Sequence, residues 1–221
     1  INLDQILNKD NIGQYEKRIN LLKKIKKFDT SNIEQAVGEV HKNIFEKKCK
    51  ALVIYGEPQS GKTETMIALT AKLLDSGKKH ILLLVTDNVK LRDQNLKIFA
   101  ESRINPTPKD NNDFLREVKE NNLDISKVPF IIFCKKNSPE LKRLIKDTKI
   151  DELDDLIIID DEADYATPNS KVNKKETGEA AEIRSVINNL IKVILNKNGI
   201  WIGVTATPGR LDLNNTYANE T

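Results

Sequence analysis

Five short apolar runs separated by helical patterns constrain the fold of this chain more than any other feature of its sequence. The runs are rich in Ile, Val and Leu and comprise residues 51–55, 81–85, 130–133, 156–159 and 200–204. Each run is too short for a core helix, and continuous apolar character is typical of a strand buried on both faces, as in a parallel sheet. The segments between the runs carry apolar residues at helical spacing. This alternation predicts an α/β domain of three layers around a mainly parallel sheet.

A separate helical stripe precedes the first run. Its apolar residues recur at steps of three and four, at Ile12, Tyr15, Ile19, Leu22 and Ile25. We therefore predict an N-terminal helical extension over residues 1–34, an α/β domain over residues 35–215 and a tail over residues 216–221. Because the chain begins with Ile1 rather than Met, we expect it to be part of a longer protein.

Cysteine content and hydropathy indicate the compartment. The two cysteines, Cys49 and Cys134, lie far apart, and Cys134 ends an apolar run as a small buried residue would. The start of the chain has no signal peptide, and no apolar run reaches the length of a membrane span. We therefore predict a cytoplasmic protein with no membrane partner. A net charge of +3 is compatible with a nucleic-acid partner but does not require one.

A glycine-rich segment follows the first apolar run and matches the pattern G-x-x-x-x-G-K-[ST]. The matching residues are Gly56, Glu57, Pro58, Gln59, Ser60, Gly61, Lys62 and Thr63. A buried strand leads into the segment and a helical pattern leads out, which is the context that a phosphate-binding loop requires. We expect the backbone N–H groups and the helix N-terminus to bind the phosphates of ATP. Lys62 is expected to reach the β- and γ-phosphates, and Thr63 to ligate Mg²⁺.

An acidic cluster follows the fourth apolar run. A buried strand that ends in adjacent carboxylates is unfavourable unless those carboxylates hold a cation. Nucleotide-bound Mg²⁺ is such a cation. We assign Asp161 to the Mg²⁺ and Glu162 to the attacking water, so that Lys62, Asp161 and Glu162 form the predicted catalytic set. Asp160 competes for the metal role because it also follows the apolar run. Asp164 is expected to tie this segment to its neighbours.

Small hydroxyl residues follow the fifth apolar run, in the sequence Thr205-Ala206-Thr207-Pro208. Taken alone, this is a strand that ends in a turn at Pro208. Thr205 and Thr207 are candidates to sense the phosphate or to bond to Asp164, which would couple the third motif to the acidic cluster.

These three sites, in this order, resemble the first RecA-like domain of superfamily 2 helicases and translocases of the DEAD/DEAH type. Residues 161–164 spell Asp-Glu-Ala-Asp, and residues 205–207 are similar to the family's Ser/Thr-Ala-Thr motif. The details of residues 59–63, 160–164 and 203–208 resemble ATPases found with bacterial restriction and phage-defence endonucleases. The resemblance extends from about Gln35 to Asn215.

The resemblance implies a doubly wound sheet, with ATP and Mg²⁺ bound at the carboxyl ends of the strands. It also implies that nucleic acid, DNA rather than RNA, crosses those ends. Gln35 lies where restriction-type members carry a glutamine that reads adenine, although an ordinary helix residue is the alternative. The candidate nucleic-acid contacts follow strand ends and are Asn88, Arg92, Lys135 and Lys136. It is equally possible that they are ordinary polar side chains on the surface with no role in binding nucleic acid.

From this resemblance we expect the ATP-binding motor domain of a DNA-dependent helicase or translocase in a restriction or phage-defence system. The family's second RecA-like domain, with its arginine finger, is absent from these 221 residues. We expect residues 216–221 to lead towards it. Such a finger typically contributes about 10³–10⁵ in rate. The fragment alone is therefore expected to bind ATP–Mg²⁺ but to hydrolyse it slowly.

Two other function classes remain open. A P-loop phosphotransferase would need a substrate pocket and lid arginines, whereas adjacent Asp161 and Glu162 favour attack by water. A nucleotide-dependent regulatory switch is the second class, and its GTPase form would need an Asn-Lys-x-Asp motif that the chain lacks. A nuclease pattern at Asp110, Glu117 and Lys119 would need a strand, where the apolar spacing predicts a helix.

Overall fold

The computed structural model describes residues 12–56, 61–166 and 178–206. Within them, six strands form one sheet in the order β1-β6-β5-β2-β4-β3, and every neighbouring pair is parallel. The strands are β1 (Ala51–Tyr55), β2 (His80–Val85), β3 (Lys109–Asp110), β4 (Phe130–Lys135), β5 (Ile157–Asp161) and β6 (Ile200–Thr205). Because the sheet is parallel, all the strands end at the same edge, which is where the predicted site residues gather.

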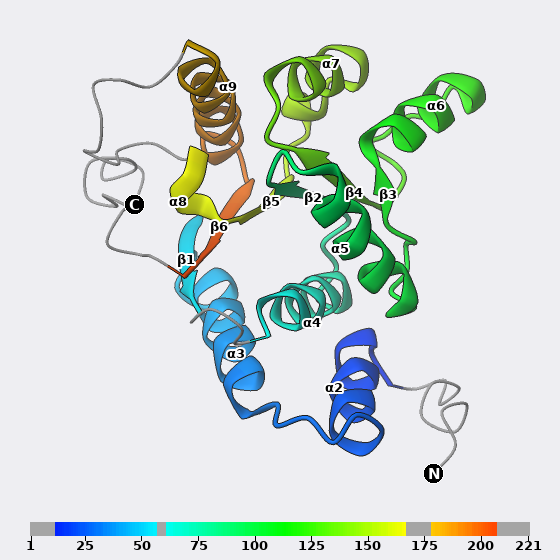
Figure 1. Ribbon diagram of the computed structural model, residues 1–221, viewed down its shortest axis with the longest axis vertical. Coiled ribbons are helices and arrows are strands. Elements are labelled where there is room, and N and C mark those ends of the chain that lie inside the picture. The colour runs from blue at the N-terminus through cyan, green and yellow to red at the C-terminus, as the bar shows by residue number, and fades with distance from the viewer. Residues whose placement is uncertain (1–11, 57–60, 167–177, 207–221) are drawn as a thin grey trace.

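Helices cover both faces of the sheet (Figure 1). They are α2 (Gln14–Lys24), α3 (Ser31–Phe45), α4 (Lys62–Asp75), α5 (Val89–Glu101), α6 (Asn111–Asn121), α7 (Ser138–Thr148), α8 (Ala163–Ala166) and α9 (Gly178–Leu195), with a 3₁₀ turn, η1 (Ile150–Glu152). Figure 1 shows α3 and α4 on one side of the sheet, and α7 and α9 on the other. The three predicted layers are therefore present.

The strands supply two separate apolar cores because successive side chains point to opposite faces. Ile157 and Ile159 of β5 pack with residues of α2, α3, α4 and α5. Ile158, between them, packs with residues of α6, α7 and α9 on the other face, as does Trp201 of β6. This alternation fixes which face each polar residue at the end of β5 occupies.

The sequence-based predictions of fold class and strands are confirmed. All five apolar runs lie in strands, namely β1, β2, β4, β5 and β6, and the predicted helix at the nuclease-like pattern is α6. The two-residue edge strand β3 was not predicted, because it is too short to show a pattern. Helix α3 was also not predicted as an element, although Ile33, Val37, Val40 and Ile44 are buried at helical spacing.

The N-terminal helices share the core of the α/β domain. Ile19 and Leu22 of α2 lie in the same cluster as Met66 and Leu69 of α4. The predicted boundary between residues 34 and 35 falls inside α3, so the division into an extension and a domain stays a prediction about the sequence. In the part of the chain that the structure describes, no helix is long and apolar enough to cross a bilayer.

Gly203 of β6 lets the segment after β5 approach the sheet closely. A Cβ placed on Gly203 would lie 2.9 Å from the Cβ of Ala163, the first residue of α8, and 2.9 Å from ring atoms of Trp201. Contacts this close require one element to shift. The glycine therefore helps to position the residues immediately before α8, which are the acidic cluster.

We predict that Gly203→Ala lowers the free energy of unfolding by about 1–3 kcal/mol, the range for overpacking a filled core. The matched control is Gly38→Ala in α3, where a new Cβ meets nothing within 4 Å. At this exposed helical position the substitution is expected to stabilise by about 0.5–1 kcal/mol. Urea denaturation of both variants tests the pair, and equal stability of the two would contradict the packing argument.

Candidate nucleotide-binding site

The described part of the phosphate loop has the expected strand–loop–helix arrangement. Gly56 follows β1, and its N–H donates to the carbonyl of Thr205 at 3.0 Å. Gly61 precedes α4 with φ +79°, in the left-handed region, and a Cβ there would meet the ring of Phe28 at 3.3 Å. A side chain at position 61 would therefore be strained on both counts. Glu57, Pro58, Gln59 and Ser60 lie outside the described residues.

Lys62 and Thr63 begin α4, so they lie where the helix N-terminus presents its free N–H groups. Across from them, β5 ends at Asp161. Burial raises the pKa of the Asp161 carboxyl, and the positive charge of Lys62 partly opposes this rise. The structure therefore brings a desolvated carboxylate and the phosphate-loop lysine within electrostatic reach. An oxygen ligand on each side, from Asp161 and Thr63, suits Mg²⁺ bound together with phosphates.

Glu162 adopts a left-handed backbone conformation, with φ +52°. This conformation is uncommon for a residue with a side chain, and such residues gather at functional sites. The side chain of Glu162 is exposed, at the carboxyl edge of the sheet, immediately before α8. It is thus free to meet a water molecule at this edge, as its predicted role requires.

We correct the prediction that Asp160 competes for the metal. Asp160 has no exposed surface and forms an ion pair with Lys136, whose Nζ lies 2.6 Å from its Oδ1. Its Oδ2 accepts a hydrogen bond of 3.3 Å from Nε1 of Trp201. Strand alternation turns Asp160 towards the core of α7 and α9, away from the face of the sheet that Asp161 shares with α4. Its carboxylate is already compensated there.

The predicted link between the acidic cluster and the third motif is present. The hydroxyl of Thr205, the last residue of β6, donates to Oδ1 of Asp164 at 2.6 Å. Thr205 thereby touches both the acidic segment and, through its carbonyl, Gly56 of the phosphate loop. Thr207 lies outside the described residues. The coupling role of these residues remains a prediction.

A pocket of about 370 Å³ opens beside Lys62. It lies between α3 and the end of β1, and its lining residues include Asn32, Gln35, Glu39, Tyr55 and Gly56. Gln35 therefore lies on the pocket next to the phosphate loop, although the sequence motif that singled it out was short. The structure brings Gln35 and Lys62 together, and adenine contact by Gln35 stays a prediction.

Helix α2 and the residues after it form a clamp on the start of α4 that the sequence did not predict. Arg18 is buried and pairs with Glu64, in the first turn of α4. Nζ of Lys26 lies 3.1 Å from the same carboxylate. The clamp holds the helix whose first residues are Lys62 and Thr63. Its members lie far apart in the chain, so no local pattern could have revealed the pairing.

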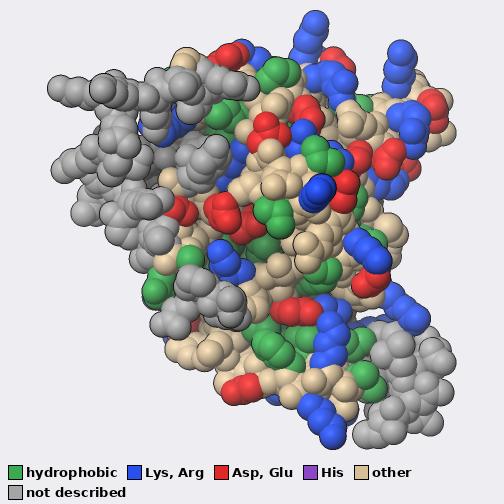
Figure 2. All heavy atoms as spheres, viewed as in Figure 1, with side chains coloured by type: hydrophobic (Ala, Val, Ile, Leu, Met, Phe, Trp, Pro, Cys, Tyr) green, Lys and Arg blue, Asp and Glu red, His purple; other side chains and the backbone are tan. Residues whose placement is uncertain are grey.

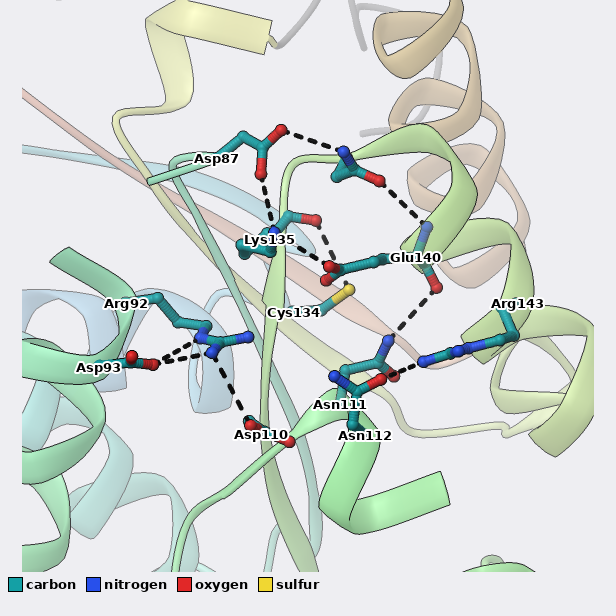
Figure 3. Close-up of polar contacts among 11 residues, drawn as sticks. Asp87, Arg92, Asp93, Asp110, Asn111, Asn112, Cys134, Lys135, Glu140 and Arg143 are labelled. Atoms are coloured by element: carbon teal, nitrogen blue, oxygen red, sulfur yellow. Dashed lines mark hydrogen bonds and ion pairs between the residues drawn. The ribbon is translucent and has the colours of Figure 1, made fainter. Parts of the chain in front are cut away.

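Three candidate nucleic-acid contacts are engaged by protein partners, and Figure 3 shows those of Arg92 and Lys135. Lys135 lies between Asp87, at 3.1 Å, and Glu140, at 2.9 Å, and the hydrogen bond to Glu140 is the main cause of its raised pKa. Arg92 pairs with Asp93 at 2.8 Å. Asn88 caps α5 by accepting a hydrogen bond of 3.2 Å from the N–H of Leu91. The three do lie together at the predicted edge of the sheet.

The fourth candidate, Lys136, is wrong as a surface contact. Its side chain has no exposed area, and its Nζ pairs with Asp160 and donates to the carbonyls of Asp161 and Glu162. A lysine after a strand end is indistinguishable in sequence from an exposed one, because its burial depends on elements distant in the chain. Its true partners are the acidic cluster itself.

Comparisons with known proteins bear on the family and the fold. A family model described as "Type III restriction enzyme, res subunit" matches residues 16–210. Among solved structures, the chain is similar to a nuclease-deletion mutant of the type ISP restriction-modification enzyme LlaGI in complex with a DNA substrate mimic, with a TM-score of 0.53 and 16% identity. That match covers 80% of this chain but 17% of the LlaGI chain, and it concerns the fold. No curated protein sequence matches.

The burial of Asp161 predicts a conflict between stability and metal binding. Its ionised form is desolvated, so in the absence of a cation Asp161→Asn should raise the midpoint of thermal unfolding at pH 7. The pKa of Asp161 is raised in the folded state, so its cost to stability grows as the pH rises through that value. The gain should therefore shrink as the pH falls towards the ordinary value of about 3.9.

Asp124→Asn is the control, and it should change the midpoint of thermal unfolding in the opposite direction. Hydrogen bonding to Ser126, with the nearby charge of Lys127, lowers the pKa of this exposed carboxyl to about 2. Its ionised form is favoured in the folded state, so its replacement should lower the midpoint at pH 7. Thermal melts from pH 4 to pH 8 test both variants. A lower midpoint for Asp161→Asn at pH 7 would contradict the desolvation argument.

Proposed function

We propose that this chain, which belongs to the type III restriction enzyme res subunit family, is the ATP-binding motor domain of a DNA-dependent ATPase in a restriction system. The observation that carries the proposal is the position of Asp161, a half-buried carboxylate at the end of β5 whose raised pKa is partly opposed by the charge of Lys62. Desolvation makes this carboxylate unfavourable in isolation, whereas Mg²⁺–ATP would compensate it. The site thus fits a nucleotide–metal complex.

Each residue of the site has a role that its position permits. Lys62 binds the β- and γ-phosphates at the N-terminus of α4, and Thr63 and Asp161 hold Mg²⁺. Mg²⁺ bound there would neutralise the charge that develops on the phosphates. Glu162 orients water for attack on the γ-phosphate. Among the described residues, no group of three His, Cys, Asp or Glu could hold a metal ion.

The proposed DNA partner rests on the family and on the arrangement of the edge that carries the site. The LlaGI structure was obtained with a DNA substrate mimic, but its likeness to this chain is one of fold. On the face in Figure 2, Lys and Arg side chains are interspersed with Asp and Glu, without a continuous basic stripe. We therefore infer that DNA engages Arg92 and Lys135 locally, by exchanging their carboxylate partners for phosphates, and that Asn88 keeps its cap and donates to phosphate through its side-chain amide N–H.

A second RecA-like domain is the proposed protein partner. The nucleotide site lies at an open edge of the sheet, where Glu162 is exposed. Completion of the site by an arginine from a second domain would raise the rate of hydrolysis, as in related ATPases. We place the proposed motor as a helicase or translocase, in which closure of two domains on ATP drives movement along nucleic acid.

We predict that Glu162→Gln lowers the kcat for DNA-stimulated ATP hydrolysis by the full-length protein about 10²–10⁴-fold, the range for loss of a general base. Binding of ATP should persist, because the phosphate loop is unchanged. Lys62→Ala should instead weaken binding. The matched control is Glu101→Gln, on the exposed last turn of α5. Hydrolysis without DNA that survives the loss of Glu162 would overturn the proposed mechanism.

We also predict that the 221-residue chain alone binds Mg²⁺–ATP but hydrolyses it slowly, by about 10³-fold or more relative to the full-length protein with DNA. The reason is that the proposed mechanism needs an arginine from a partner domain. Equilibrium binding of a fluorescent ATP analogue and a phosphate-release assay measure the two properties. Robust DNA-stimulated turnover by these residues alone would contradict the requirement for a partner domain.

A further inference from the structure

Lys136 has its ammonium group fully enclosed beside the acidic cluster. The residue follows β4, and its backbone N–H donates to the carbonyl of Val85, at the end of β2, at 2.8 Å. Its Nζ lies 2.6 Å from Oδ1 of Asp160, 2.7 Å from the carbonyl oxygen of Asp161 and 2.9 Å from that of Glu162. The two carbonyls accept hydrogen bonds from the ammonium group, and the carboxylate of Asp160 forms an ion pair with it. All three partners belong to consecutive residues.

Two of these acceptors belong to the backbone that carries the proposed catalytic carboxylates. Because the carbonyls of Asp161 and Glu162 both face one ammonium group, the peptide units on either side of Glu162 are held in a single orientation. Glu162 has φ +52°, which a residue with a side chain rarely adopts unless its surroundings impose it. The contacts to Lys136 are surroundings of that kind.

The ion pair with Asp160 alone does not explain why a lysine is buried here. A buried ion pair is often no more stabilising than apolar side chains of similar volume, since both charges lose their hydration. The pair does, however, keep the ammonium charged and fixed in place. Asp160 is itself fixed by the hydrogen bond from Trp201. The arrangement is that of an anchored donor directed at two carbonyls.

We propose that Lys136 is a positioning residue for ATP hydrolysis, which holds the turn at Asp161 and Glu162 so that one carboxylate faces Mg²⁺ and the other faces the attacking water. This inference rests on the proposed function of the site. Lys136 touches neither nucleotide nor water and acts through the backbone of the two acids. Outer-shell groups of this kind typically contribute about 10–100-fold to metal affinity or activity.

The test uses three variants of the full-length protein with DNA. Lys136→Met removes all three donors while keeping most of the side-chain volume. Asp160→Asn removes the ion pair but leaves the lysine amine beside the two carbonyls. The double variant K136M/D160N removes both charges, so it contains no uncompensated buried charge and keeps the test possible if Lys136→Met alone does not fold.

We expect Lys136→Met and the double variant to show the same fall in kcat, about 10–100-fold. The KM for ATP should stay within about threefold of wild type, and the half-saturating concentration of Mg²⁺ should rise, because Asp161 is displaced. The kcat is expressed per nucleotide-binding site, counted with a fluorescent ATP analogue, so that unfolded protein does not contribute. The double variant should be more thermally stable than Lys136→Met, and Asp160→Asn should lose less activity than either.

The matched control is Asp155→Asn, which removes the partner of the buried His80, at 2.6 Å, at the opposite end of β2. It should lower stability but leave kcat per site and the Mg²⁺ requirement unchanged. Recovery of kcat in the double variant would show that Lys136 only neutralises Asp160, and would overturn the proposal. Hydrolysis that depends on Glu162 but not on Lys136 would overturn it too. Wild-type protein without Glu162-dependent hydrolysis would overturn the proposed function, and the positioning role with it.

Discussion

The site depends on how a strand buried on both faces accommodates two adjacent carboxylates. Asp160 and Asp161 end β5, and strand alternation sends them to opposite sides of the sheet. Each meets a lysine there: Asp160 pairs with Lys136, and Asp161 lies in the field of Lys62. The first pair is closed and has no exposed surface. The second lies at the edge of the sheet, where the Asp161 residue keeps some exposed surface.

Strand β6 connects the parts of this site because it lies between β1 and β5. Its last residue, Thr205, accepts a hydrogen bond from Gly56 of the phosphate loop and donates one to Asp164. Gly203 allows close approach of the segment that follows the acids, and Trp201 holds Asp160. A single strand thus contacts both the phosphate loop and the acidic cluster, which is the physical basis for the predicted coupling between them.

The sequence predicted what local patterns encode, and missed what depends on distant pairing. The five apolar runs predicted the parallel sheet, which the structure confirms. They also predicted that Lys62 and Asp161 lie at the same edge, since the ends of parallel strands meet there. The same argument could not separate Lys135 from Lys136, which are adjacent and chemically identical. Only the three-dimensional packing shows that the second is enclosed. The clamp of Arg18 on Glu64 was missed for the same reason.

The ion pairs of these two lysines also differ in their exposure to solvent. Lys135 pairs with Asp87 and Glu140, whose side chains are 40% and 23% exposed, while its own side chain is 11% exposed. Lys136 and its partner Asp160 have no exposed side-chain area, and loss of either partner would leave a buried charge. Of two adjacent lysines, one therefore pairs with carboxylates that reach solvent, and the other is enclosed with its carboxylate inside the turn.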